Sequence, residues 1–180
     1  MSAKARLIEI LNERSVRFGS FTLASGRESD FYVDGRQTTL DPEGSWLISE
    51  LILERLHPEV EAVGGLTMGA DPVACSLSAV SWQKGTPMPA FLIRKQPKGH
   101  GLKRCVEGRD RLEEGAKVCI VEDTTTTGGS LLEAIEKAEN EGLVVVQTLT
   151  VVDREEGATE RLAQAGYSLE ALVTRSDLEG

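Results

Sequence analysis

The sequence predicts an α/β fold with a mainly parallel sheet flanked by helices and a small hood at the N-terminus. After about residue 56, short apolar runs alternate with amphipathic helical segments, which is the pattern of βαβ units. The first 40 or so residues fall outside this alternation. A chain of 180 residues is long enough for one domain with a substantial core. We therefore expect residues 1–180 to form a single domain, in which residues 1–40 are the hood.

The hood is expected to begin with a helix over residues 3–17, where apolar residues recur on one side. Residues 21–35 then read as an extended segment punctuated by glycine. The next helix should start at Asp41-Pro42, because Asp is a favoured cap and Pro suits the first helical position. This helix should end near residue 56.

The alternating part of the chain supplies the predicted sheet. Strands are expected over residues 61–66, 90–94, 118–123 and 143–153, and helices over residues 71–82, 130–141 and 155–166. In open α/β sheets, ligands bind beyond the carboxyl ends of the strands. The Gly64-Gly65 turn, the Arg94 region, the loop after residue 121 and the Asp153-Arg154 turn all follow strands, so we expect them at that edge.

Composition argues against several classes of function. The net charge of −9 does not suit a general nucleic-acid binder, which needs a basic face. No run of about 18 apolar residues predicts a membrane span, and the N-terminus lacks the apolar segment of a secretory signal. The three cysteines form no disulfide or zinc pattern. We therefore expect a protein of the reducing cytoplasm with neither a nucleic-acid nor a membrane partner.

The most informative segment is residues 118–130, VCIVEDTTTTGGS, an apolar strand followed by two acids and a loop of Thr, Gly and Ser. Such a turn before a helix presents N–H groups and the positive end of the helix dipole, which suits phosphate. Glu122 and Asp123 suit the hydroxyl groups of the same ligand. The alternative is an ordinary strand–turn–helix unit whose polar residues only cap the helix. The run exceeds what one cap needs, so it indicates a sugar-phosphate site.

This segment resembles the 5-phosphoribosyl-1-pyrophosphate (PRPP) signature of the type I phosphoribosyltransferases. The resemblance implies the fold of that family and departs from its pattern at Thr124 and Thr125, where apolar residues are usual. It also implies a set of PRPP-binding residues in this loop, namely Glu122, Asp123, Thr124, Thr125, Thr126, Thr127, Gly128, Gly129 and Ser130.

Residues 94–104, RKQPKGHGLKR, hold five of the 20 basic residues and no acid. Their Pro and Gly predict a loop, which is either a solvated charged loop or a contact for a polyanion such as pyrophosphate. The segment resembles the catalytic loop of the orotate phosphoribosyltransferases, although Gly99 stands where the family usually has Asp. The resemblance implies that Lys98 and His100 stabilise the leaving group, with Arg94 and Lys95 on the same anion. Lys98, His100 and Asp123 are therefore the expected catalytic residues.

Three further segments resemble the same family. Residues 21–36 resemble its hood over orotate, with Ala24 in place of a frequent Lys and with Phe31 and Tyr32 at the aromatic positions. Residues 64–70 resemble its pyrophosphate loop, with Met68 near a position where Lys is common. Arg154 matches the Arg that binds the orotate carboxylate. The expected orotate contacts are Phe31, Tyr32, Thr126 and Arg154.

The implied reaction joins orotate to PRPP and yields orotidine 5′-monophosphate and pyrophosphate in pyrimidine synthesis. The resemblance implies Mg²⁺ held mainly by PRPP and water, with no dedicated protein ligands. It also implies a homodimer whose loop 94–104 acts across the interface. A purine or xanthine phosphoribosyltransferase and a non-catalytic PRPP-sensing regulator remain as alternatives.

Overall fold

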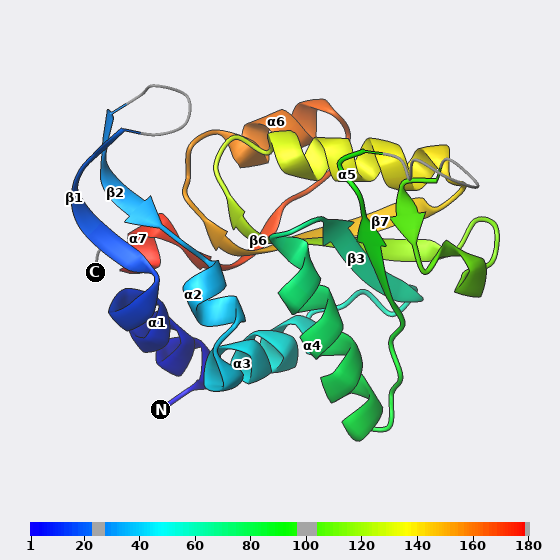
Figure 1. Ribbon diagram of the computed structural model, residues 1–180, viewed down its shortest axis with the longest axis horizontal. Coiled ribbons are helices and arrows are strands. Elements are labelled where there is room, and N and C mark those ends of the chain that lie inside the picture. The colour runs from blue at the N-terminus through cyan, green and yellow to red at the C-terminus, as the bar shows by residue number, and fades with distance from the viewer. Residues whose placement is uncertain (23–27, 97–103, 179–180) are drawn as a thin grey trace.

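The structure is a computed structural model that describes residues 1–22, 28–96 and 104–178. Its main sheet has the order β5-β4-β3-β6-β7-β8, and a separate pair of antiparallel strands belongs to the N-terminal region (Figure 1). Within the main sheet all neighbours pair in parallel except β4 and β5, which pair antiparallel. Its strands are β3 (Ala62–Leu66), β4 (Ala90–Ile93), β5 (Val106–Glu107), β6 (Lys117–Thr125), β7 (Val144–Asp153) and β8 (Glu170–Thr174). The expected α/β architecture is confirmed.

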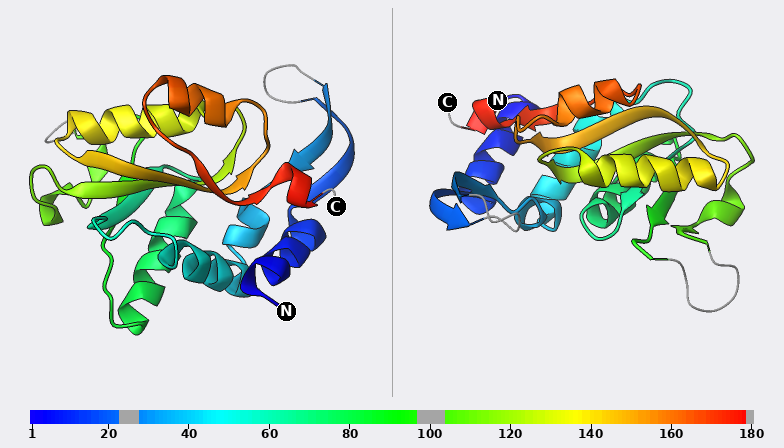
Figure 2. Two further views of the ribbon diagram at one scale, coloured as in Figure 1. Left: turned by 180° about the vertical axis from the view of Figure 1, so that it is seen from behind. Right: turned by 90° about the horizontal axis from the view of Figure 1, so that it is seen from above.

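Helices cover both faces of this sheet (Figures 1 and 2). One face packs against α3 (Pro42–Leu53) and α4 (Ala70–Gln83), and the other against α5 (Gly129–Asn140) and α6 (Ala158–Gln164). In β6, Cys119 and Val121 belong to the first core, whereas Val118 and Ile120 belong to the second. This two-sided burial explains why the central strand is a continuous apolar run.

The N-terminal hood consists of α1 (Ala3–Arg14), the strands β1 (Val16–Thr22) and β2 (Glu28–Val33), and the short helix α2 (Arg36–Thr39). The expected helix over residues 3–17 is therefore too long. It ends at Arg14 because Val16 and Arg17 pair with Val33 and Tyr32 in the small sheet. A β-branched residue such as Val16 favours the strand.

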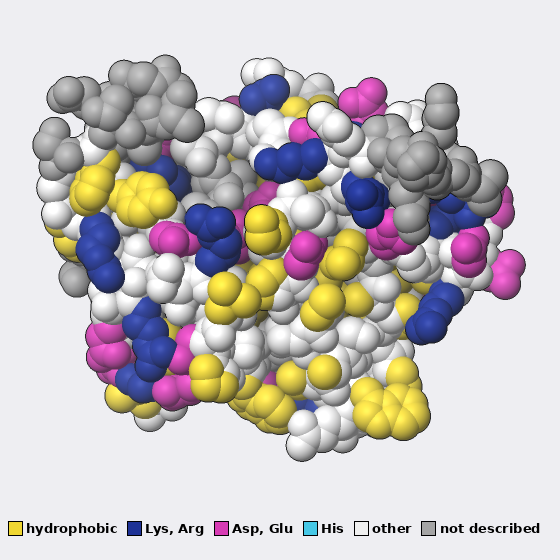
Figure 3. All heavy atoms as spheres, viewed as in Figure 1, with side chains coloured by type: hydrophobic (Ala, Val, Ile, Leu, Met, Phe, Trp, Pro, Cys, Tyr) yellow, Lys and Arg dark blue, Asp and Glu magenta, His cyan; other side chains and the backbone are white. Residues whose placement is uncertain are grey.

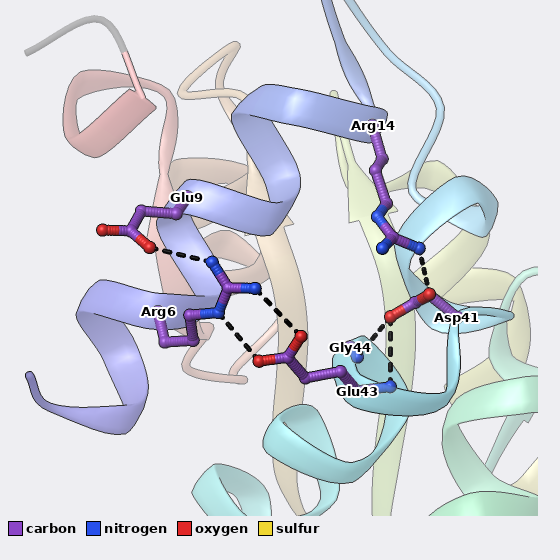
Figure 4. Close-up of polar contacts among 6 residues, drawn as sticks. All are labelled: Arg6, Glu9, Arg14, Asp41, Glu43 and Gly44. Carbon is purple, nitrogen blue, oxygen red and sulfur yellow. Dashed lines mark hydrogen bonds and ion pairs between the residues drawn. The ribbon is translucent and has the colours of Figure 1, made fainter.

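Polar contacts join α1 to the start of α3 (Figure 4). The guanidinium of Arg6 donates to both carboxylate oxygens of Glu43, at 2.8 and 2.9 Å. Asp41 caps α3 by accepting from the N–H groups of Glu43 and Gly44, and it also pairs with Arg14. The predicted cap at Asp41-Pro42 is confirmed, and it fastens the hood helix to the body as well.

Several boundaries differ from the expectations. Gly64 and Gly65 lie inside β3 rather than in a turn, and both are glycine because the neighbouring residues leave no room for a side chain. A Cβ at Gly64 would lie 2.5 Å from the ring of Phe91, and one at Gly65 would lie 2.6 Å from Ala70. The helix expected over residues 155–166 is shorter in the structure, where α6 begins after Gly157, which adopts φ 96°.

Some elements were not predicted at all. These are the strands β5 and β8 and the C-terminal helix α7 (Arg175–Leu178). They are too short to show a clear period of apolar residues. Among the described residues, none of the helices has the length and apolar character required to span a membrane.

Candidate active site

A cavity of about 440 Å³, here called the main cavity, opens at the carboxyl ends of β3, β4 and β6. The hood contributes residues 32–36 to its lining, and the turn after β3 contributes residues 66–69. Lys95, residues 122–124 and Ser130 complete the lining. The sequence predicted this edge of the sheet as the ligand site, and the structure brings these distant segments together there.

Two carboxylates stand at the centre of the main cavity. Glu122 is only 7% exposed, and its burial, followed by the repulsion of Asp123, raises its pKa to about 9. Both carboxylates point toward Gly69, where a Cβ would lie 2.6 Å from Oε1 of Glu122 and even closer to Oδ1 of Asp123. A side chain at residue 69 would therefore displace both carboxylates. The acids form one cluster of acceptors, which suits hydroxyl groups better than phosphate.

A second cavity of about 150 Å³, here called the loop cavity, is lined by Glu122 and residues 124–131. It lies over the start of α5, where the N-cap residue Gly128 adopts φ 75° and provides no side-chain cap. A Cβ at Gly128 would lie 2.6 Å from Leu162, so the backbone can approach α6 only without a side chain. The first N–H groups of a helix are strong anion donors when no side chain caps them.

The two threonines that depart from the family pattern have different surroundings. Thr125 is buried and its hydroxyl forms a 2.9 Å hydrogen bond with that of Thr150 on β7. The polar substitution is therefore satisfied inside the sheet. Thr124 lies against the hood, and its buried hydroxyl has no hydrogen-bond partner among the described residues.

The basic segment after β4 is only partly described. Lys95 lines the main cavity, whereas Lys98 and His100 lie outside the described residues. Arg94 lines neither cavity, because its guanidinium forms a 3.2 Å ion pair with Glu107. The expectation that Arg94 shares the anion with Lys95 does not match this arrangement.

Lys137 on α5 is a positioning residue that the sequence did not reveal. Its ammonium donates to the carbonyl groups of Arg94 and Lys95, at 3.0 and 2.7 Å, and to Glu133. It therefore holds the backbone that carries Lys95 against the helix of the signature loop. In the sequence, Lys137 stands four residues after Glu133, and this spacing predicts only an ordinary ion pair on a helix surface.

The expected orotate contacts are divided. Tyr32 is 37% exposed and lines the main cavity, but Phe31 is fully buried. The Phe31 ring lies 5.8 Å from the guanidinium carbon of Arg154 and 4.9 Å from that of Arg175. The ring therefore packs against these two arginines. Because it is fully buried, it cannot stack directly on a ligand in this arrangement.

Arg154 is 5% exposed and links the sheet to the hood. Its Nη2 donates to the carbonyl of Phe31 at 3.1 Å and pairs with Glu156 at 2.8 Å. It is therefore fixed in orientation, under the hood and beside the carboxyl end of β7. Neither described cavity is lined by Arg154 in this state.

The hood also places residues at the cavity that were not predicted. Asp34, Gly35 and Arg36 all line it. The available signal was a cation directly after an Asp-Gly turn at the end of a strand. Among the described residues there is no group of three or more His, Cys, Asp or Glu that could hold a metal ion.

An open, mainly parallel sheet, an acidic pair at the end of its central strand and an anion loop directly after it define a type I phosphoribosyltransferase. Comparison with known proteins makes the assignment more specific. No family model matches the chain. Its curated relatives include the orotate phosphoribosyltransferase of Bradyrhizobium diazoefficiens, 49% identical over 98% of this chain and 96% of the relative. That of Nostoc sp. is 40% identical over 98% of this chain and 85% of the relative.

Solved structures agree with these relatives. The orotate phosphoribosyltransferase of Mycobacterium tuberculosis superposes with a TM-score of 0.85 at 41% identity, covering 98% of this chain and 99% of that one. A phosphoribosyltransferase of Corynebacterium diphtheriae has a TM-score of 0.84 at 42% identity over both full chains. The chain belongs to the orotate phosphoribosyltransferase family. Members are pentosyltransferases that convert orotate and PRPP to orotidine 5′-monophosphate and pyrophosphate in pyrimidine biosynthesis.

Proposed function

We propose that residues 1–180 form one cytoplasmic phosphoribosyltransferase domain that joins orotate to PRPP in the main cavity. One observation carries this proposal. The acceptor pair Glu122 and Asp123 lies directly beside the uncapped start of α5. Groups that accept hydrogen bonds from hydroxyls and groups that donate hydrogen bonds to phosphate therefore lie along one continuous edge. This is the arrangement that a phosphorylated ribose requires. A solved complex of the Mycobacterium tuberculosis relative with PRPP, at 36% identity and a TM-score of 0.81, supports it.

The 5-phosphate would bind in the loop cavity, to N–H groups and hydroxyls of residues 126–130. Asp123, with Glu122 beside it, would accept hydrogen bonds from the ribose hydroxyls. Lys95 would contact the pyrophosphate, and the family resemblance adds Lys98 and His100 as leaving-group donors. Thr124 and Thr125 would support the loop from the strand.

The reaction breaks the bond between C1 of ribose and the pyrophosphate oxygen and forms a bond from C1 to N1 of orotate. Positive charge develops on the ribose ring while the pyrophosphate takes the electron pair. The residues described above lower the barrier by aligning the two reactants and by stabilising the departing anion. The hood would exclude water from the reacting atoms.

Orotate would lie between the hood and the end of β7. Arg154 suits its carboxylate because a guanidinium can donate two parallel hydrogen bonds. Tyr32 and Thr126 would complete the pocket. Arg94 would support the stem of the loop through its ion pair with Glu107, and the buried ring of Phe31 would support Arg154.

Mg²⁺ fits this site as an ion that PRPP brings with it. Mg²⁺ prefers oxygen ligands and commonly binds through one or two carboxylates plus substrate phosphates and water. The side chains of Glu122 and Asp123, which converge at Gly69, would offer oxygen ligands to the ion beside the substrate phosphates. When bound, the ion would neutralise charge on the pyrophosphate.

The decisive experiment is an assay with PRPP and Mg²⁺ that compares orotate with hypoxanthine, xanthine, adenine and uracil. We expect loss of the near-ultraviolet absorbance of orotate only when PRPP and Mg²⁺ are both present. Equal or faster use of a purine base would contradict the orotate assignment. PRPP binding without turnover of any base would favour the regulator.

We further propose a homodimer in which residues 94–104 reach the partner's site. Large exposed apolar side chains support an interface on the face of α2, α3 and α4, where hydrophobic groups gather in Figure 3. They are Leu40, Trp46 and Trp82.

Mixing Lys98→Ala and Asp123→Asn subunits tests this arrangement. Each variant homodimer should be nearly inactive, and random re-pairing should restore about a quarter of the sites. No recovery, with hybrids verified by mass, would mean that each loop serves its own subunit.

A further inference from the structure

We propose that Arg36 is a pyrophosphate-binding residue, which contacts the leaving group of PRPP from the hood side of the main cavity. This inference rests on the proposed function, because it requires the pyrophosphate to occupy that cavity. It adds a second cation from a different element to Lys95, and no sequence pattern had marked it.

The position of Arg36 is fixed by a close approach between the hood and β6. At the preceding residue, Gly35, a Cβ would lie 2.5 Å from the Thr124 hydroxyl and 3.1 Å from Oδ2 of Asp123. The hood backbone therefore touches the strand that carries the ribose acceptors. Arg36 follows immediately, at the start of α2, and its side chain lines the cavity.

Its guanidinium is oriented by one carboxylate and keeps donors available. Asp34 accepts from the backbone N–H of Arg36 at 3.3 Å and from its Nε at 3.1 Å. Hydrogen bonds raise the pKa of Arg36, first from Asp34, and the charge of Asp123 adds to the effect. The two terminal nitrogens donate to no other described residue. They form the planar edge that binds phosphate oxygens in a bidentate way.

The charge balance of the cavity requires such a donor. Among its described lining residues, three side chains are acidic and two are basic. The basic ones are Lys95 and Arg36, on opposite segments, namely the end of β4 and the hood. Asp34 and Asp123 would repel a pyrophosphate, and Lys95 and Arg36 offset this repulsion from two sides of the cavity.

The test compares Arg36→Gln and Arg36→Lys with Arg17→Gln, which removes a hood cation outside the cavity. We measure the KM values of PRPP and orotate, inhibition by pyrophosphate with Mg²⁺, and direct pyrophosphate binding by calorimetry. Arg36→Gln should weaken PRPP and pyrophosphate about 10-fold to 100-fold. The KM of orotate should stay within about twofold in this variant.

Arg36→Lys should recover part of the loss, because it keeps the charge but not the planar fork. Arg17→Gln should behave as wild type. Pyrophosphate binding within twofold of wild type in folded Arg36→Gln would overturn the inference, as would a rise in the KM of orotate alone. Failure of the wild-type protein to bind PRPP would instead overturn the proposed function.

Discussion

The main cavity has two walls that are held in place by different kinds of contact. The signature wall, residues 122–130, lines the main cavity with residues 122–124 and 130 and the loop cavity with the residues between them. It is continuous in sequence and continues directly from β6, which pairs with β3 and β7 on its two sides. The hood wall, residues 32–36, comes from a separate small sheet and reaches the cavity only through contacts with distant residues. The first wall is therefore built by local structure, and the second by docking.

The docking contacts are few and specific. Arg154 donates to the Phe31 carbonyl, Gly35 packs on Thr124, and Arg6 of the hood donates to Glu43 on α3 at 2.8 Å. Loss of one such contact can shift the whole hood wall, whereas the signature wall keeps its neighbours in the sheet. Substitutions in the signature wall should therefore change ligand affinity at constant stability, and those in the hood wall should change both.

The largest effect should come from Asp123→Asn in the signature wall. An amide accepts more weakly than a carboxylate from ribose hydroxyls, so PRPP affinity should fall about 100-fold, or about 3 kcal/mol. Stability without ligand should stay near that of wild type, because Glu122, with its pKa raised to about 9, is neutral at pH 7 and does not repel Asp123. Calorimetric titration with PRPP and thermal unfolding measure the two quantities, with exposed Glu113→Gln as the control. Wild-type affinity would mean that the acidic pair serves the helix alone.

Arg154→Ala should raise the KM of orotate about 10-fold to 100-fold, through the loss of roughly 1.5–3 kcal/mol of charge-assisted hydrogen bonding. It should also lower the melting temperature, since the Phe31 carbonyl loses its donor. Arg175→Ala is the matched control, because it removes the other guanidinium on the same ring. An equal rise in the KM of orotate in both variants would show that the effect comes from the hood and not from a carboxylate contact.

Gly35→Ala tests the docking of the hood wall directly. The added Cβ must displace Thr124 or Asp123, so stability should fall by about 1–3 kcal/mol and the KM of PRPP should rise about tenfold. Gly115→Ala is a control whose cost comes from backbone strain alone, because Gly115 has φ 78° and open space around it. It should lose stability but keep its kinetic constants. Unchanged kinetics in Gly35→Ala would mean that the walls are independent.

Glu122→Gln should change stability in a way that depends on pH. Burial, then Asp123, raises the pKa of Glu122 to about 9, whereas the ordinary value is 4.5. Between these values the folded protein binds one proton more than the unfolded chain, so wild-type stability falls as pH rises. The glutamine variant lacks this term.

Its melting temperature relative to wild type should therefore increase between about pH 5 and about pH 8. A constant difference across this range would show that Glu122 is ionised in the folded protein.

The sequence by itself determined the central sheet and the signature wall. Apolar runs of β6 and β7 specify buried parallel strands, and the acids, threonines and glycines of residues 122–130 act through their own backbone. These preferences are local, so they can be recognised without knowing what surrounds them. The same holds for the Asp41 cap, which is formed by residues two and three positions away.

Only the tertiary structure decided what the hood does. Phe31 is buried because Arg154, 123 positions away, and Arg175 pack on it, and Arg94 is turned from the cavity by Glu107. Arg36 reaches the cavity only because Gly35 can touch Thr124. These outcomes depend on contacts between side chains that are far apart in the sequence. Such contacts produce no periodic pattern in the sequence, so they cannot be predicted from it. The phosphate loop can therefore be predicted from the sequence, whereas the cations that face the cavity are determined by tertiary packing.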